Sequence, residues 1–113
     1  MTTPDGGLPV HAVTVADFDS VAQHARSAPD RIACVDCETG AELSYKMLDA
    51  RVELAAAWLG AEIEEGGRLA WLGRNSLDML IAHLACSRSG RIFVPLNWRL
   101  AAPELAAILA DCE

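Results

Sequence analysis

The sequence predicts an α/β fold in which a short hairpin is followed by a parallel βαβα unit. Two observations lead to this class. Apolar residues recur at helical spacing in several segments, and two runs that are apolar on both alternating faces, residues 69–72 and 92–96, flank one of those segments. Two strands joined through a helix lie parallel in a right-handed crossover. With 113 residues and 52% hydrophobic content, the chain is long enough for one domain with a core.

The first helix is expected after a loose lead-in. Residues 1–13 are rich in Thr, Pro and Gly without periodicity, so residues 14–113 are taken as the folded part. Thr14 followed by Asp17 is typical of a helix N-cap with an acidic partner. Pro29 ends the helix by restricting Ala28. The apolar face of this helix comprises Phe18, Val21, Ala22 and Ala25.

A hairpin and a long helix are expected next. The runs 32–35 and 41–44 are separated by a turn at 38–40, which indicates two short strands. Ser44 is placed to cap the following helix, and Gly60 together with residues 62–67 is expected to end it. The apolar stripe of this helix is Leu48, Val52, Ala55, Ala56 and Leu59.

The βαβα unit begins near residue 68. Residues 69–72 are expected to form a strand covered on both faces, and Asn75 with Asp78 indicates the start of a helix whose left-handed C-terminal cap is Gly90. Residues 92–96 form the second strand, with Pro95 marking its end. The helix between the strands carries its apolar face on Leu77, Leu80, Ile81, Leu84 and Ala85.

Pro103 opens a last helix with an apolar face on Leu105, Ile108 and Leu109. No further strand follows it within these 113 residues, so a sheet edge and a helix face are left without partners. We therefore expect an incomplete domain. If the chain is stable by itself, we expect it to form a homodimer or another association through the exposed sheet edge.

Charge and composition restrict the partners. The net charge of -7 disfavours binding to nucleic acid and to an anionic membrane surface. No apolar stretch is long enough to cross a bilayer, and the first residues show neither a signal peptide nor a transit peptide. The expected location is the cytoplasm.

The cysteines and histidines do not form a metal motif in the sequence. Cys34 and Cys37 have C-x-x-C spacing, but Cys86 and Cys112 supply no matching second pair. The first pair lies at the end of a strand-like run, whereas a redox pair needs a helix N-terminus that lowers the thiol pKa. Ordinary thiols are therefore the main interpretation, and a small redox domain remains the alternative. His11, His24 and His83 form no ligand cluster, so no metal site is predicted.

Several phrases occur together in an order that resembles one enzyme family. They are the Ala28-Pro29-Asp30 helix stop, Ser44-Tyr45 before the long helix, Gly73-Arg74-Asn75-Ser76, and the run from Val94 to Leu100 that reads VPLNWRL. From about residue 17 to 113 the chain resembles the N-terminal part of acyl-CoA synthetases of the adenylate-forming, AMP-binding superfamily. The fold that this implies is an N-terminal partial domain of the adenylate-forming fold.

The resemblance implies an ATP-dependent ligase for a fatty acid or related carboxylic acid. In such enzymes the carboxylate attacks ATP to give an acyl-adenylate, and the thiol of CoA then displaces AMP. Magnesium, a Ser/Thr/Gly-rich phosphate loop and a catalytic lysine serve this chemistry in the family. This chain lacks the loop, and Lys46 is its only lysine. We therefore expect no catalytic residue here and no activity for the chain alone; a non-enzymatic, stand-alone interaction or dimerising domain is the alternative.

One family role falls on a residue of this chain. In some relatives the Arg of the Asn-x-Arg-Leu motif contacts a phosphate at the nucleotide end of CoA, and that position here is Arg99. A guanidinium on a loop between a strand and a helix suits a phosphate. The other interpretation is that Arg99 caps nearby carbonyls or pairs with Glu104.

Other polar and aromatic residues are given structural roles. Asn75 is interpreted as a helix cap, and the acidic residues between 62 and 65 as a solvated turn. The three tryptophans, Trp58, Trp71 and Trp98, are expected to pack rather than to stack on a base.

Overall fold

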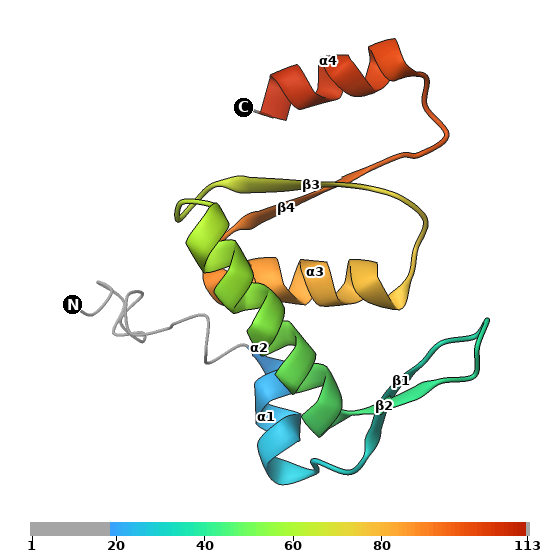
Figure 1. Cartoon of the computed structure of the whole chain (residues 1–113), viewed down its shortest axis with the longest axis vertical. Helices are drawn as coiled ribbons and strands as arrows, with labels where there is room; N and C mark the ends of the chain where they lie inside the picture. Colours follow the sequence, from blue (N-terminus) through green and yellow to red (C-terminus); the bar gives the residue numbers. More distant parts are fainter. Residues whose placement is uncertain (1–18, 113) are drawn as a thin grey trace, which may run out of the picture.

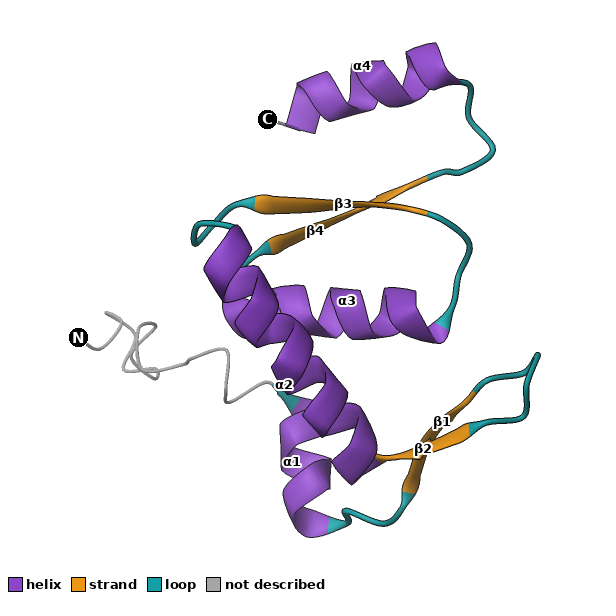
Figure 2. Cartoon of the chain, in the orientation of Figure 1, coloured by secondary structure: helices purple, strands orange, loops and turns teal. Residues whose placement is uncertain are grey.

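The computed structural model describes residues 19–112, and its helices and strands follow the predicted order (Figures 1 and 2). Strands β1 and β2 pair antiparallel, and β3 and β4 pair parallel, which confirms the α/β class with a hairpin before a βαβα unit. The elements are α1 (Ser20–Ser27), β1 (Ile32–Val35), β2 (Glu42–Ser44), α2 (Tyr45–Glu62), β3 (Arg68–Leu72), α3 (Leu77–Ser89), β4 (Ile92–Leu96) and α4 (Ala102–Cys112).

Helix α1 begins after Asp19. A carboxylate oxygen of Asp19 accepts the backbone N–H of Ala22 at 3.0 Å, which satisfies one of the free donors of the first turn. The predicted cap, Thr14, lies outside the described residues, as do Asp17, Phe18 and the lead-in. The helix therefore starts later than predicted, but it ends before Pro29 as expected.

Helix α2 starts at the predicted cap and ends within the predicted stretch. The Ser44 hydroxyl accepts the backbone N–H of Met47 at 3.2 Å. The helix passes through Gly60 and ends at Glu62 with Ile63 as its C-cap, which lies within the stretch 62–67 that was expected to end it. Leu59 is buried beside Gly60, and this packing outweighs the weak helix propensity of glycine.

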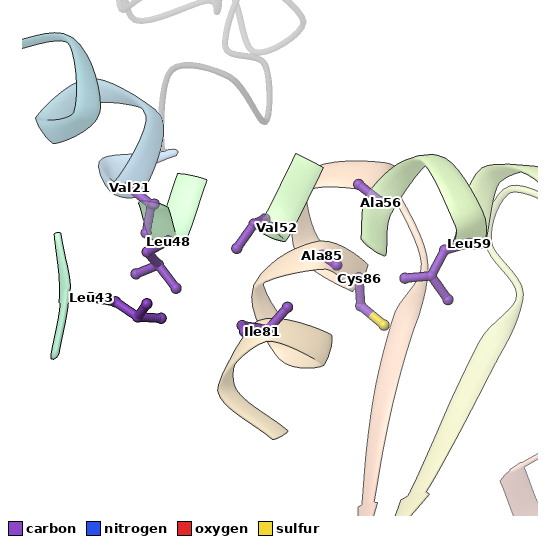
Figure 3. Close-up of a cluster of buried hydrophobic side chains, with 9 residues drawn as sticks. All are labelled: Val21, Leu43, Leu48, Val52, Ala56, Leu59, Ile81, Ala85 and Cys86. Atoms are coloured by element: carbon purple, nitrogen blue, oxygen red, sulfur yellow. The ribbon is translucent and has the colours of Figure 1, made fainter. Parts of the chain in front are cut away.

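The core lies between α2 and α3 and extends to α1 and β2 (Figure 3). Helix α2 contributes four of the five residues of its predicted stripe, and Ala55 packs beside them only partly buried. Helix α3 contributes Cys86 in addition to two predicted residues. The buried residues are Val21, Leu43, Leu48, Val52, Ala56, Leu59, Ile81, Ala85 and Cys86.

Arg88 in the last turn of α3 ties three helices together. Its guanidinium contacts the α1 cap Asp19 at 2.7 Å, Asp49 of α2 at 2.7 Å and Glu53 of α2 at 3.2 Å. The Arg88 side chain is 15% exposed and that of Asp19 is 14% exposed. The hydrogen bond from Arg88 holds the pKa of Asp19 below its ordinary value, although burial acts in the opposite direction. This ion-pair network joins the N-terminus of α1 to the α2–α3 pair.

Helix α3 connects the two parallel strands. Its cap is Ser76, whose hydroxyl accepts the backbone N–H of Met79 at 3.2 Å, so the assignment of the cap to Asn75 is wrong. A Ser one residue closer to the helix satisfies the same free donors. Gly90 ends the helix with φ +75° and ψ +25°, as predicted for a left-handed cap.

Strand β4 has the predicted range, Ile92–Leu96, with Pro95 next to its last residue. The ladder with β3 continues to Leu96, which is paired with Leu72. Within residues 19–112, β4 has a neighbouring strand on one side only, so a residue without an N–H is tolerated there. Leu96, the last residue of β4, is buried and directly precedes the loop that begins at Asn97.

The sheet has helices on both sides, but they cover its faces unequally (Figure 2). Helix α3 covers the face that carries Leu69 and Phe93, which pack against the core. On the other face, Ala70 and Val94 share a cavity of about 480 Å³ with Leu109 and other residues. The expectation of strands covered on both faces therefore holds only on the α3 side, and α4 has no fully buried residue.

Exposed apolar side chains remain around the sheet, among them Leu72 at 58% and Ile92 at 46% exposure. The expected homodimerisation or other association through the exposed edge of the sheet stays a prediction. Within the described residues, no helix combines the length and apolar character needed to cross a membrane.

Candidate functional site

The candidate site lies where the two parallel strands end. Since β3 and β4 are parallel and in register, the loops that follow Leu72 and Leu96 reach the same edge of the sheet. A hollow of about 380 Å³ lies between these loops and the start of α3. It is lined by Gly73, Asn75, Met79, Pro95, Leu96, Asn97, Trp98 and Arg99. The predicted phosphate-contacting residue, Arg99, is therefore at the usual ligand-binding edge of an open α/β sheet.

A tight turn places Arg99. The side-chain oxygen of Asn97 accepts the backbone N–H of Arg99 at 3.0 Å, and the Asn97 carbonyl accepts the N–H of Leu100 at 3.1 Å. Within residues 19–112 the Arg99 side chain forms neither an ion pair with Glu104 nor a hydrogen bond to a carbonyl. The contacts that the capping or ion-paired interpretation requires are thus not formed among these residues, and the Arg99 guanidinium lies over the Trp98 ring, 5.1 Å from the ring centre.

A second guanidinium, which the sequence interpretation missed as a site residue, lies over the same ring. The Arg74 guanidinium carbon is 4.8 Å from the centre of the Trp98 ring. Trp98, which was expected to be a packing residue, is 43% exposed and lies outside the core. Its ring instead makes cation–π contacts with two guanidinium groups. The available signal was positional, because Arg74 follows β3 at nearly the same distance as Arg99 follows β4.

This arrangement favours an anionic ligand. Arg74 and Arg99 are both exposed, and within the described residues no carboxylate forms an ion pair with either. Two guanidinium groups with free donors suit the oxygens of a phosphate group in bidentate geometry. A second hollow of about 470 Å³, lined by Arg74, Asn75, Trp98 and Arg99, offers space for such a group. In a chain with net charge -7, this is a local concentration of positive charge.

The C-x-x-C pair lies on β1 and in the turn that follows it. Cys34 is partly buried in β1, and burial raises its pKa above the ordinary value for a thiol. Cys37 is exposed in the turn after β1, and it lines a hollow together with Ser76 and Leu77 at the start of α3. Burial also raises the pKa of Cys86 in the core. Since a redox pair needs a lowered thiol pKa, these surroundings weigh against the redox alternative.

The described residues do not fit magnesium triphosphate. Within residues 19–112, no group of three or more His, Cys, Asp or Glu side chains is placed to hold a metal ion. Lys46 is exposed in the first turn of α2, an element that does not line either hollow at the strand ends. The donors at the strand ends are guanidinium groups and the amides of Asn75 and Asn97, which fit a phosphate group without a metal ion.

The other singled-out residues have simpler surroundings. Trp58 is 58% exposed on α2, so the expectation that it packs is wrong. Trp71 is partly buried in β3, and its indole N–H is buried with no hydrogen-bond acceptor among the described residues. Glu62, Glu64 and Glu65 are exposed as expected, although Glu62 is the last residue of α2 and only the other two lie in the connection that follows.

Comparisons with known proteins agree with this architecture. The family model described as AMP-binding enzyme matches residues 21–113. The indoleacetate–CoA ligase of Aromatoleum aromaticum is 47% identical over 72 residues, which is 63% of this chain and 14% of that enzyme. The inhibitor-bound N-terminal domain of FACL13 from Mycobacterium tuberculosis superimposes with a TM-score of 0.77 at 33% identity, over 81% of this chain and 23% of that one.

A third similarity is to the O-succinylbenzoate coenzyme A synthetase MenE of Bacillus subtilis in complex with ATP and magnesium. Its TM-score is 0.74 at 29% identity, over 80% of this chain and 25% of that one. The chain thus spans less than a third of the length of each of these three relatives. The family match nevertheless covers most of the chain, and the fold agrees with the N-terminal part of these enzymes. The chain therefore belongs to the AMP-binding enzyme family, within which it corresponds to an N-terminal part of an adenylate-forming enzyme.

Proposed function

We propose that this chain supplies the first part of the large domain of an ATP-dependent carboxylic acid–CoA ligase, with residues 14–113 as the folded portion. The complete ligase would form an acyl-adenylate and then an acyl-CoA. The observation that carries the proposal is the family match over residues 21–113, supported by relatives named as acid–CoA ligases. Those relatives include an indoleacetate ligase and a medium-chain fatty acid ligase, so the proposed substrate is a carboxylic acid as a class.

The test of the activity is CoA-dependent release of AMP. A ligase that contains this chain is incubated with ATP, magnesium, CoA and a panel of aromatic and aliphatic carboxylic acids. We expect AMP and a thioester to appear in equal amounts with at least one acid. AMP formation that never depends on CoA would contradict the assignment to this class of ligase.

Arg99 is the proposed contact for a phosphate at the nucleotide end of CoA. Its guanidinium is exposed beyond the carboxyl end of β4 and has no carboxylate partner among residues 19–112. In the ligase, Arg99→Ala should raise the KM for CoA while acid-dependent ATP–pyrophosphate exchange continues at the wild-type rate. Arg68→Ala, which removes an exposed arginine at the other end of the neighbouring strand, is the matched control. An unchanged KM for CoA in Arg99→Ala would remove the assignment.

These 113 residues are proposed not to activate an acid by themselves. Catalysis at the triphosphate of ATP needs backbone N–H groups that bind the phosphate oxygens. It also needs side-chain cations and a metal ion that stabilise the negative charge as it develops during the reaction. The sequence has no Ser/Thr/Gly-rich loop ending in Pro-Lys, and its only lysine lies on α2. ATP–pyrophosphate exchange measured on this chain with several carboxylic acids should stay at background. Exchange that depends on the added acid would show that the chain holds a complete adenylation site.

A further inference from the structure

We propose that Arg74 is a second phosphate-binding guanidinium and that Trp98 positions it beside Arg99, so that the two arginines bind one phosphate monoester dianion at the ends of β3 and β4. The proposal rests on the proposed function in taking a nucleotide phosphate as the ligand. It extends that function, because Arg74 and Trp98 receive roles and the site changes from one cation to two.

The first argument is topological. Arg74 comes from the loop after β3, and Arg99 from the loop after β4. The two strands are parallel neighbours, and their last residues, Leu72 and Leu96, are paired. Two residues that follow these strands at similar distances must therefore lie at one edge of the sheet. The fold thus brings together two cations that are 25 positions apart in the sequence.

The second argument is the shared indole ring. The guanidinium carbons of Arg74 and Arg99 lie 4.8 and 5.1 Å from the centre of the Trp98 ring. Two guanidinium groups beside one ring repel each other, and the attraction of the ring offsets part of this repulsion. Within the described residues, no carboxylate pairs with either group. A bound anion would remove the remaining repulsion. The ring therefore holds both groups at the border of one hollow in the absence of the anion that would suit both.

The third argument is the chemistry of the ligand. A phosphate monoester near neutral pH carries close to two negative charges and three acceptor oxygens. Each guanidinium offers parallel donors to two of those oxygens. The hollow of about 470 Å³ lined by both arginines also exposes Asn75, whose amide adds a further donor. Because guanidinium groups lie over the Trp98 ring, this ring serves the cations rather than a stacked base.

Equilibrium binding to the 113-residue chain tests the proposal. The probe is adenosine 3′,5′-bisphosphate, and adenosine, which lacks the phosphates, is the control ligand. Binding is measured by calorimetry at low ionic strength, where exposed charges are least screened. We expect the bisphosphate to bind and adenosine to bind at least about tenfold more weakly, because a charge-assisted pair contributes on that scale.

The variants distinguish three effects on binding: the loss of a guanidinium group at the site, the loss of its positioning by the ring, and a general change in charge. Arg74→Ala and Arg99→Ala should each weaken binding of the bisphosphate by about tenfold, and Arg68→Ala by less than about twofold. Trp98→Leu should weaken binding by roughly threefold, whereas Trp98→Phe, which keeps an aromatic face, should restore it. In the Arg74→Ala background, Trp98→Leu should have a smaller effect than in the wild type, because the residue to be positioned is gone.

The outcomes are distinct for the two proposals. If Arg99→Ala weakens binding and Arg74→Ala does not, the two-arginine site is wrong and the assignment of Arg99 stands. If Arg74→Ala weakens binding and Arg99→Ala does not, the assignment of Arg99 is wrong as well as the shared site. If Trp98→Leu and Trp98→Phe behave alike, the positioning role of the ring is wrong. Circular dichroism of each variant must match the wild type for these comparisons to count.

Discussion

The arginines of this chain show how its helical half differs from its strand ends. In the helical half, Arg88 is 15% exposed and pairs with Asp19, Asp49 and Glu53. At the strand ends, Arg74 and Arg99 are exposed, lie over Trp98 and form no ion pair with a carboxylate among residues 19–112. The same side chain therefore holds elements together in one region and stays available in the other.

The physical cost of each arrangement explains the contrast. A largely buried guanidinium loses its hydration, so it needs several hydrogen-bonded carboxylates to offset that loss. Arg88 obtains them because the first turn of α1 and the face of α2 converge on the end of α3. Arg74 and Arg99 retain water, and their proximity adds repulsion rather than stability. Such an arrangement is expected where a site serves a ligand rather than the fold.

The largest test of the comparison is a core truncation. Leu59→Ala removes a side chain that is 2% exposed between α2 and α3, and it should lower the free energy of unfolding by about 3 kcal/mol. Leu72→Ala, the same truncation at a strand end where the side chain is 58% exposed, should change it by less than about 1 kcal/mol. Urea denaturation followed by circular dichroism measures both. Equal losses would show that the strand ends are packed as tightly as the helical half.

The arginines themselves provide the second test. Arg88→Ala leaves the partly buried carboxylates of Asp19 and Asp49 without their cation, and it should cost about 2 to 3 kcal/mol of stability. Arg99→Ala removes no ion pair and should change stability by less than about 0.5 kcal/mol. The same denaturation experiment compares the two variants. A stability loss in Arg99→Ala similar to that in Arg88→Ala would place Arg99 in the structural framework and break the comparison.

The pH dependence of stability sharpens the role of Asp19. Its hydrogen bond from Arg88 lowers its pKa in the folded chain below the ordinary 3.8, so the unfolded chain binds the proton more readily. The stabilisation is therefore complete above about pH 4 and is lost as the pH falls through the lower, folded pKa. Asp19→Asn should reduce stability at neutral pH by about 1.5 kcal/mol and flatten the decline in acid. Thermal unfolding from pH 7 to pH 2 measures this; an equally steep decline in the variant would assign the acid sensitivity to other carboxylates.

Local patterns in the sequence were sufficient for most of the fold. The apolar stripe of α2, the Ser44 cap and the left-handed Gly90 depend on neighbouring residues, and all three were predicted correctly. The failures occurred where tertiary packing decides the outcome. Strands β3 and β4 were expected to be covered on both faces but are covered only on the α3 side, and Trp58 was expected to pack but is 58% exposed.

The candidate site was predictable only in part. Arg99 was identified because the residues around it resemble a family motif. Arg74 carries no local signal of its own, since its importance depends on the parallel register that brings the ends of β3 and β4 together. The role of Trp98 depends on both arginines and was therefore also missed. The Arg88 network was missed for the same reason, because its partner Asp19 is distant in sequence and meets it only after α1 packs on α2 and α3.

Two glycines provide the finest test, because one lies within the helical half and the other joins it to the sheet. Gly90 has φ +75°, and its carbonyl accepts the N–H of Gly66 at 3.0 Å. Gly90→Ala forces a side chain into the left-handed region and should cost about 1 kcal/mol. Gly60 lies inside α2 with no atom within 4 Å of the added methyl group, so Gly60→Ala should raise stability by about 0.5 to 1 kcal/mol.

The opposite signs of these two changes make the test specific. Both variants add one methyl group, so a general effect of size or hydrophobicity would shift the urea midpoint in the same direction. Backbone conformation instead predicts a lower midpoint for Gly90→Ala and a higher one for Gly60→Ala. A lower midpoint in Gly60→Ala would mean that α2 is not a regular helix at that position, and that the helical half ends earlier than Glu62. The boundary between the two regions would then lie within α2 itself.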